Sequence, residues 1–416
     1  MTLLNNILSK VFVKGTVKSV LGLGVTTTIG YGTLYYSISI MSEEFATHFY
    51  WSKSFIFAII SLGILLGGLI APTVGSILDK HGARNLMSLG SLFCAIGLFF
   101  LSLVETKFQF IAAILFLEVV SVLVLYEAAF VAFSQLAGNK ARLPIIQITF
   151  IAGFASTIFW PLITYLLTIM SWSDVYKVLA LFHIFIALPI HYFVLKPNLL
   201  INNEDLDEDS FEDCICIEGK LKKDSLILLA IAFSLIAIPI TAMQTQFLAL
   251  FKTFGIEAAS AVALGALIGP SQVIARVLDM SFSKKTTPMI TAIVSTSIMT
   301  VGMALLLFSG YDYIIAVLFI VLYGAGQGLS DIVRGTLPLY LFGKDRYGKT
   351  MGGLNLFRLI VTSMVPFGFA YILETFGGVV STMVLVVSTS IAVILLIIIN
   401  YQIREVKNEV KVSRNS

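Results

Sequence analysis

The chain has 416 residues, of which 58% are hydrophobic and 12% are charged, and its formal net charge is +3. Soluble domains are about half apolar and about a quarter charged, so this composition excludes a disordered chain, a coiled coil and an ordinary cytosolic enzyme. Lysine and arginine are scattered over many short segments, which argues against binding of nucleic acid. Three cysteines are too few for a disulfide framework, and we expect no metal site. Cys94 lies in an apolar run and is expected to be a packing residue.

Long apolar segments follow one another along the whole chain. A membrane-spanning helix needs about 20 mostly apolar residues. Twelve segments meet this length: 18–41, 53–78, 85–104, 108–136, 144–170, 174–195, 225–251, 258–279, 287–309, 313–340, 350–375 and 379–402. They are continuous runs and not the short alternating segments of a membrane barrel. The sequence therefore predicts an all-α membrane protein with twelve transmembrane helices, embedded in lipid.

One polar segment divides these spans six from six. Residues 197–224 hold eight acidic residues before Lys220, Lys222 and Lys223. Such a composition is typical of a solvated linker. We expect an N-terminal six-helix bundle at 1–196, a linker at 197–224 and a C-terminal six-helix bundle at 225–416.

The positive charges predict the orientation. If both termini and the linker are cytoplasmic, 20 of the 27 lysines and arginines lie on the cytoplasmic side of the membrane and four lie outside. The cytoplasmic set is Lys10, Lys14, Lys18, Lys80, Arg84, Lys140, Arg142, Lys196, Lys220, Lys222, Lys223, Lys284, Lys285, Lys344, Arg346, Lys349, Arg404, Lys407, Lys411 and Arg414. An odd number of spans would destroy this bias in one half of the chain.

The loop between the second and third spans carries a spaced motif. It reads Gly75, three residues, Asp79, Lys80, one residue, Gly82, one residue, Arg84. Gly82 permits unusual backbone angles, and Asp79 suits a neighbouring helix N-terminus. The run resembles the signature loop of the major facilitator superfamily, and with six-plus-six spans the resemblance covers essentially the whole chain.

The resemblance implies a secondary transporter that works as a monomer. Two six-helix bundles rock around a central site, and the loop motif latches the outward-facing state against the other half. These roles pass to Asp79 and Arg84, with Gly75 and Gly82 allowing close packing. The fourth span lacks the basic residue of many proton-coupled drug exporters, and the fifth lacks their Gly-Pro motif. Residues 323–338 with Trp160-Pro161 resemble a bacterial permease subgroup for siderophores, arsenicals and organic anions, which implies the bacterial cytoplasmic (inner) membrane.

Charged residues inside the spans are few, and such residues usually face protein or water. We expect Arg276 and Asp279 to reach the cytoplasmic interface by snorkelling, and His191 to be interfacial. His183 is expected to be a packed neutral histidine. The intramembrane acids are Glu118, Glu127 and Asp331.

Three of the remaining charges predict the transport chemistry. Glu127 is the leading candidate for proton coupling, with Asp331 as a second, since burial favours the protonated form of a carboxyl. Arg334 and Arg358 suit an anionic substrate, because a guanidinium pairs with a carboxylate through two hydrogen bonds. Asp331 is three residues from Arg334, so Arg358 is expected to be the freer arginine. The alternative for both arginines is a structural ion-pair network.

Aromatic and amide side chains complete the predicted substrate site. By resemblance, spans one, four, seven and ten line the cavity, which adds Tyr31, Tyr35, Gln244 and Gln327; the alternative for the tyrosines is packing. Asn355 is three residues from Arg358 and is expected to act with it.

The predicted function is proton-coupled transport of a small organic anion, a carboxylate or siderophore-like solute. No nucleotide-binding loop is present in the sequence, and we expect neither a cofactor nor catalytic residues. The alternative is a drug or metabolite efflux antiporter of the same superfamily. A membrane enzyme or receptor is a third alternative and requires a catalytic cluster or a soluble domain. Substrate identity, import or export, and symport or antiport stay open.

Overall fold

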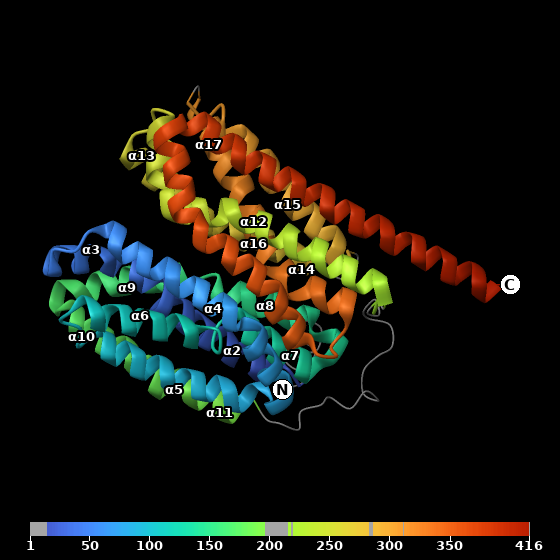
Figure 1. The fold of residues 1–416 in the computed structure, drawn as a ribbon, viewed down its shortest axis with the longest axis horizontal. Helices are drawn as coiled ribbons and strands as arrows, with labels where there is room; N and C mark the ends of the chain where they lie inside the picture. The colour runs from blue at the N-terminus through green and yellow to red at the C-terminus, as the bar shows by residue number, and fades with distance from the viewer. Residues whose placement is uncertain (1–14, 196–214, 218, 283–285, 311, 416) are drawn as a thin grey trace, which may run out of the picture. The chain divides into compact units, whose positions relative to one another are not determined.

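The computed structural model of the protein describes residues 15–195, 215–217, 219–282, 286–310 and 312–415 (Figure 1). Across these residues helix is the only regular secondary structure, which confirms the predicted all-α class. Most of the predicted linker lies outside the described residues. So do Lys10, Lys14, Lys196, Lys284 and Lys285 from the charge argument.

The helices before the linker are α2 (Val17–Gly30), η1 (Tyr31–Tyr36), α3 (Ser37–Phe49), α4 (Lys53–His81), α5 (Ala83–Leu101), α6 (Lys107–Ser121), α7 (Tyr126–Ala137), η2 (Gly138–Ala141), α8 (Arg142–Ala152), α9 (Ala155–Ile169), α10 (Trp172–Phe182), η3 (His183–Ala187) and α11 (Leu188–Val194). The remaining helices are α12 (Gly219–Thr253), α13 (Ala258–Gly265), α14 (Ile268–Phe282), α15 (Pro288–Leu306), α16 (Tyr313–Phe342) and α17 (Tyr347–Asn415). Helix α12 begins within the predicted linker, so residues 219–224 are helical.

Several helices begin at a serine or threonine that accepts a backbone N–H of the first turn. The Ser52 hydroxyl accepts from Phe55 at 3.2 Å at the start of α4. At the start of α6, Thr106 accepts from the Gln109 backbone at 3.3 Å, and the Gln109 side chain accepts in return from the Thr106 backbone at 3.0 Å. These bonds satisfy N–H groups that have no partner within the helix, and they set where each apolar run becomes helical.

Some predicted spans are interrupted. The segment predicted at 108–136 breaks at residues 122–125 between α6 and α7, and the segment at 144–170 breaks at Gly153 and Phe154. Two helical turns, η1 and η3, have π geometry, which is frequent at functional sites. Apolar content does not distinguish these geometries, so the sequence predicted the span but not the break.

The helices belong to an integral, multi-pass membrane protein. Nine helices among the described residues are long and apolar enough to cross a membrane. Large apolar side chains also remain on the outside, such as Phe185 and Phe367, which are 71% and 82% exposed. Lipid tolerates such side chains, whereas water penalises them. The count of twelve spans and the cytoplasmic termini stay predictions. Helix α17 covers two predicted spans, with Gly377 in a non-helical conformation (φ 78°) between them.

The chain folds into two compact units. The first comprises Met1–Ile215 with Pro338–Ser363, and the second comprises Cys216–Leu337 with Met364–Ser416. The predicted bundles at 1–196 and 225–416 differ from this division in one respect, since residues 338–363 join the first unit. The reason is local: the first turn of α17 is bonded to the end of α4, as described below.

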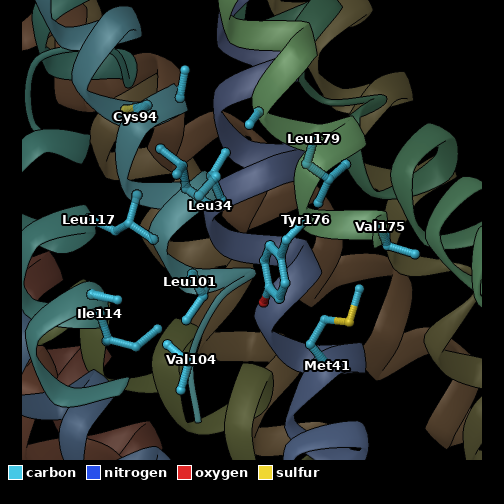
Figure 2. Packing of buried hydrophobic residues seen from close by; sticks show 14 of the residues in the cluster. Leu34, Met41, Cys94, Leu101, Val104, Ile114, Leu117, Val175, Tyr176 and Leu179 are labelled. Carbon is cyan, nitrogen blue, oxygen red and sulfur yellow. The ribbon is translucent and has the colours of Figure 1, made fainter. Parts of the chain in front are cut away.

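The apolar core of the first unit consists of two clusters of buried residues. One cluster joins α5, α6 and α10 to the segment from η1 to α3, with Leu34, Met41, Leu117 and Tyr176 among its buried members (Figure 2). Cys94 belongs to this cluster and is fully buried, which confirms the packing role predicted for it. The core holds α4 against α6 and α2 against α8, and it thereby positions the polar side chains described next.

Candidate functional site

The motif loop forms a tight turn between α4 and α5. Gly82 has φ 78° and ψ 148°, and its N–H donates to the Leu78 carbonyl at 3.0 Å. A positive φ of this kind favours glycine. The Asp79 carboxylate accepts the backbone N–H groups of Gly348 and Lys349, both at 2.9 Å. These N–H groups belong to the first turn of α17, so Asp79 caps that helix and complements the positive end of its dipole.

Glycines let the two backbones meet at this contact. A side chain at Gly75 would overlap the Gly348 carbonyl oxygen, and one at Gly352 would overlap that of Ala71. Both overlaps are with backbone atoms, which cannot rotate away as a side chain can. The close packing predicted for Gly75 is therefore present, and its partner is the start of α17.

Arg84 lies away from this contact. Its Nε donates to the Tyr192 carbonyl at 2.7 Å, and its guanidinium carbon is 4.3 Å from the centre of the Tyr192 ring. Both contacts are with α11. Asp79 and Arg84 therefore hold different helices, although the motif suggested one joint role.

Gln135 is a motif partner that sequence reasoning missed. Its side chain accepts from the Ala83 N–H at 3.0 Å and donates to the Leu78 carbonyl at 2.9 Å. It comes from α7 and bridges the last turn of α4 to the first turn of α5. A glutamine near the end of a largely apolar helix was the available signal.

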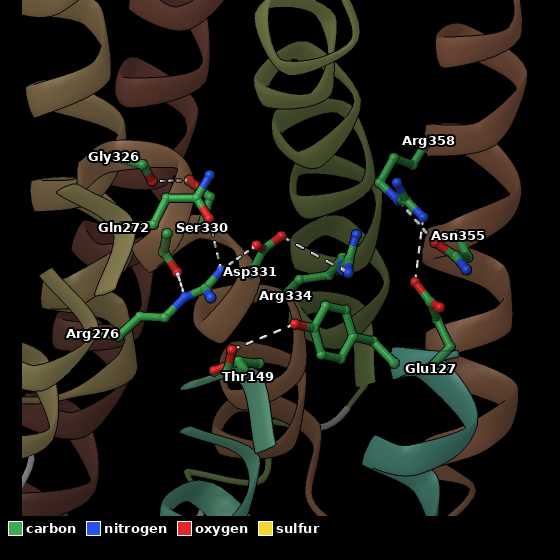
Figure 3. A network of polar contacts seen from close by, with 12 residues as sticks. Glu127, Thr149, Gln272, Arg276, Gly326, Ser330, Asp331, Arg334, Asn355 and Arg358 are labelled. Atoms are coloured by element: carbon green, nitrogen blue, oxygen red, sulfur yellow. Dashed lines mark hydrogen bonds and ion pairs between the residues drawn. The ribbon is translucent and has the colours of Figure 1, made fainter. Parts of the chain in front are cut away.

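A second polar cluster joins α7 to α17 within the first unit. The Arg358 guanidinium donates to the Glu127 carboxylate at 3.3 Å and to the Asn355 side-chain oxygen at 2.8 Å (Figure 3). Asn355 is buried, and the Arg358 and Glu127 side chains are 18% and 13% exposed. Asn355 thus acts with Arg358 as their spacing suggested. The expectation that Arg358 is the freer arginine is wrong, because its acid comes from another helix.

A third cluster lies in the second unit, between α14 and α16. Arg276 donates to the Asp331 carboxylate at 2.7 Å and to the Gly328 carbonyl at 3.1 Å. Arg334 approaches the other Asp331 oxygen at 4.0 Å, so Figure 3 shows one carboxylate between two guanidinium groups. Arg276 is 1% exposed. The snorkelling predicted for Arg276 is wrong, because the ion pair with Asp331 offsets the cost of burying its charge.

The tyrosines of the predicted site lie on the π-helical turn η1. The Tyr31 ring centre is 5.9 Å from that of Tyr35 and 4.7 Å from that of Tyr126. Tyr35 is 38% exposed. In the second unit Gln244 is exposed on α12 and Gln327 is partly buried on α16. The structure therefore brings Tyr31 and Tyr35 together in the first unit, whereas Gln244 and Gln327 belong to two different helices of the second unit.

Two histidines bond α2 and η1 to α11 and η3. His191 is fully buried; its Nδ1 lies 2.8 Å from the Ser91 hydroxyl and 3.1 Å from the Met87 carbonyl, and its Nε2 lies 2.9 Å from the Thr26 hydroxyl. The predicted interfacial position of His191 is therefore wrong. His183 is packed as expected, with Nε2 2.7 Å from the Thr33 hydroxyl.

Comparison with known proteins identifies the family. The family model described as Major Facilitator Superfamily matches residues 21–366. The chain belongs to the major facilitator superfamily, whose members are transporters and not enzymes. It is therefore an integral membrane protein of a secondary transport family.

Solved structures share the fold. The human organic anion transporter MFSD10 (TETRAN) matches with a TM-score of 0.69 and 14% identity, covering 91% of this chain and 98% of that chain. The proton:xylose symporter XylE, bound to 6-bromo-6-deoxy-D-glucose, matches with a TM-score of 0.69 and 14% identity, covering 91% of this chain and 95% of that chain. A comparison with curated proteins finds no match. Because the sequence identity is 14% in both cases, these two structures show which fold this chain has and do not show its substrate.

Proposed function

We propose that this protein is a proton-coupled secondary transporter of a small organic anion. The observation that carries the proposal is the sharing of Asp331 by Arg276 and Arg334. Two guanidinium groups share one carboxylate in this cluster. Burying arginine at membrane depth is costly, and an anionic substrate that approaches the cluster would add a further counter-charge.

Arg334 is the arginine that we assign to the substrate. Arg276 holds Asp331 at 2.7 Å and is 1% exposed, whereas Arg334 is 4.0 Å from the same carboxylate and 16% exposed. The shorter bond ties Asp331 to Arg276. Arg334 therefore makes the longer contact with Asp331, and its planar guanidinium group suits a carboxylate. Tyr31, Tyr35, Gln244 and Gln327 are proposed to supply aromatic and amide contacts to the same solute.

Proton coupling is proposed at Glu127 and Asp331. Each carboxylate holds an arginine, at 3.3 Å and 2.7 Å respectively. Protonation would remove the charge that holds the arginine and so free it for an anion. Two proteins with this fold are an organic anion transporter and a proton symporter, which is compatible with both parts of the proposal. The resemblance of residues 323–338 to bacterial permeases supports the bacterial cytoplasmic membrane.

The test uses purified full-length protein in liposomes. Uptake of radiolabelled p-aminohippurate and citrate is measured with an imposed proton gradient and with a protonophore, and D-xylose and tetraphenylphosphonium serve as neutral and cationic solutes. We expect anion uptake that the protonophore abolishes. Uptake of only the neutral or cationic solute would refute the anion assignment. Anion export driven by inward proton flow would instead identify the efflux antiporter.

Arg334→Gln tests the residue assignment. Loss of one partner of a charged pair costs about 2–5 kcal/mol, so affinity for the transported anion should fall by about 30-fold or more. Lys177→Gln is the matched control, since Lys177 is a surface cation paired with Asp174 at 2.9 Å. Equal affinities in the two variants would exclude Arg334 from the site.

A further inference from the structure

Glu118 is an intramembrane acid that the proposed function does not use. It lies in α6, eleven residues after Lys107, which is about 16 Å along the helix axis at 1.5 Å per residue. Its side chain is partly buried. The apolar run that contains it, Lys107–Ala137, is long enough to cross a membrane, so this carboxyl is deep in the apolar part of the first unit.

Two glycines of α4 make room for this side chain. A Cβ atom placed on Gly63 would lie 2.6 Å from Cγ and 3.0 Å from Cβ of Glu118, and one placed on Gly67 would lie 3.3 Å from the Glu118 carbonyl oxygen. The Glu118 side chain therefore packs directly against the backbone of α4. It is held in a defined position between helices and is not a mobile surface group.

The Glu118 carboxyl has no polar partner among the described residues. The hydrogen bond recorded for this residue is from the Ser121 hydroxyl to its main-chain carbonyl, at 2.7 Å. In contrast, Glu127 is paired with Arg358 and Asp331 is paired with Arg276. Among the intramembrane acids of this chain, Glu118 thus differs in lacking a guanidinium partner within the described structure.

The charged groups of α4 lie far along its axis from the two glycines that contact Glu118. The elements packed against α6 include α4, α5 and η1, and their ionisable residues are Lys53, Asp79, Lys80 and His81 on α4, Arg84 and Cys94 on α5, and Tyr31, Tyr35 and Tyr36 on η1. Lys53 is ten residues from Gly63 and Asp79 is twelve from Gly67, which corresponds to about 15 and 18 Å. Helix α17 also packs on α4, through Leu359 against Gly68, and its Arg358 is bonded to Glu127 and Asn355.

A carboxylate in this setting has nothing to offset its charge. The charged form of an unpaired acid is strongly disfavoured away from water, whereas the protonated form is tolerated. We propose that Glu118 is a proton-binding site, separate from the arginine-paired acids, that takes up and releases one proton in each transport cycle. The proposal rests on the proton coupling proposed above. The carboxylate takes a proton from hydronium on one side of the membrane, leaving water, and returns it to water on the other.

The first experiment needs no substrate. Infrared difference spectra between acidic and alkaline buffer are recorded on the purified full-length protein in lipid vesicles. We expect a protonated-carboxyl C=O band that Glu118→Gln removes and that persists in Glu105→Gln, a variant of an exposed acid outside the helix. An unchanged carboxyl band in Glu118→Gln would overturn the proposal.

The second experiment counts protons per transported p-aminohippurate in the same vesicles. We expect Glu118→Gln to move one proton fewer per solute than the wild type, with solute exchange retained, and Glu118→Asp to keep the wild-type ratio. An unchanged ratio in Glu118→Gln would overturn the Glu118 assignment alone. A wild-type protein that moves p-aminohippurate without protons would overturn the coupling proposal, and the Glu118 assignment with it.

Discussion

Removal of the Asp79 carboxylate should release the first turn of α17. This carboxylate accepts the Gly348 and Lys349 N–H groups at 2.9 Å each. In Asp79→Ala both donors lose their acceptor. In Asp79→Asn the side-chain oxygen can still accept one of the two N–H groups. The negative charge is lost, however, and the side-chain NH2 group of the asparagine faces the second N–H donor.

The magnitude follows from two contributions. Loss of a helix cap costs about 1 kcal/mol, with a range of about 0.5–2, and loss of a negative charge at a helix N-terminus costs about 0.3–1 kcal/mol, more when partly buried. Together these give about 2 kcal/mol for Asp79→Ala, or about a thirtyfold shift toward the released state. Asp79→Asn should cost about half as much, which is about a fivefold shift.

Hydrogen exchange measured by mass spectrometry reports this contact directly. The peptide that contains Gly348 and Lys349 should exchange about thirtyfold faster in Asp79→Ala, because local opening governs exchange of protected amides. Arg84→Ala should leave that peptide unchanged, since Arg84 bonds Tyr192 on α11. Proton-driven uptake should fall in both variants if the two residues serve the latch implied by the family motif.

Glu374→Ala provides the matched control. Glu374 is an exposed acid on the same helix α17, so its loss removes a charge without removing the cap. If Asp79→Ala and Glu374→Ala show the same exchange at Gly348 and Lys349, the capping argument is refuted. If exchange rises and transport is unaffected, the contact is real but the latch role is not.

Three further outcomes follow from the described contacts. Glu127→Gln and Arg358→Gln should each lower the thermal unfolding midpoint in detergent, because each single change leaves a buried charge without its partner. The double variant should lower the midpoint by less than the sum of the two single effects; additive effects would contradict the pairing. His191→Phe should cost about 1–3 kcal/mol by leaving buried hydroxyl groups unpaired, so an unchanged midpoint would disprove the network. Gly352→Val should cost about 1–3 kcal/mol through overlap with α4, whereas Gly353→Val, with open space at its Cβ, should be neutral.

Sequence reasoning succeeded for those features of the structure that a single residue type or a short sequence pattern determines. The left-handed turn was predictable from Gly82, and the helical class followed from apolar runs that have no other stable form in lipid. The burial of Cys94 followed from its apolar surroundings. The loop motif also pointed to the superfamily that the family model identifies.

Failures occurred where the partner is distant in sequence. Arg358 was expected to be the freer arginine because Asp331 lies three residues from Arg334, but Glu127, 231 residues away, pairs with Arg358. Arg276 was expected at the interface, yet Asp331 on another helix keeps it buried. Charge pairing across helices depends on packing that local spacing does not encode.

The sequence by itself determined the class of molecule, because solvent preference is additive over residues and twenty apolar side chains suffice to select a membrane. It also determined the loop turn, since a positive φ depends on a single glycine. Only the tertiary structure decided which charge is paired with which, because the partner that a side chain meets depends on which face of its helix packs against which neighbour. That is why Glu127, Asp331 and Glu118, all intramembrane acids in the sequence, have different environments in the fold: two are held by arginines, and one lies against the glycines of α4.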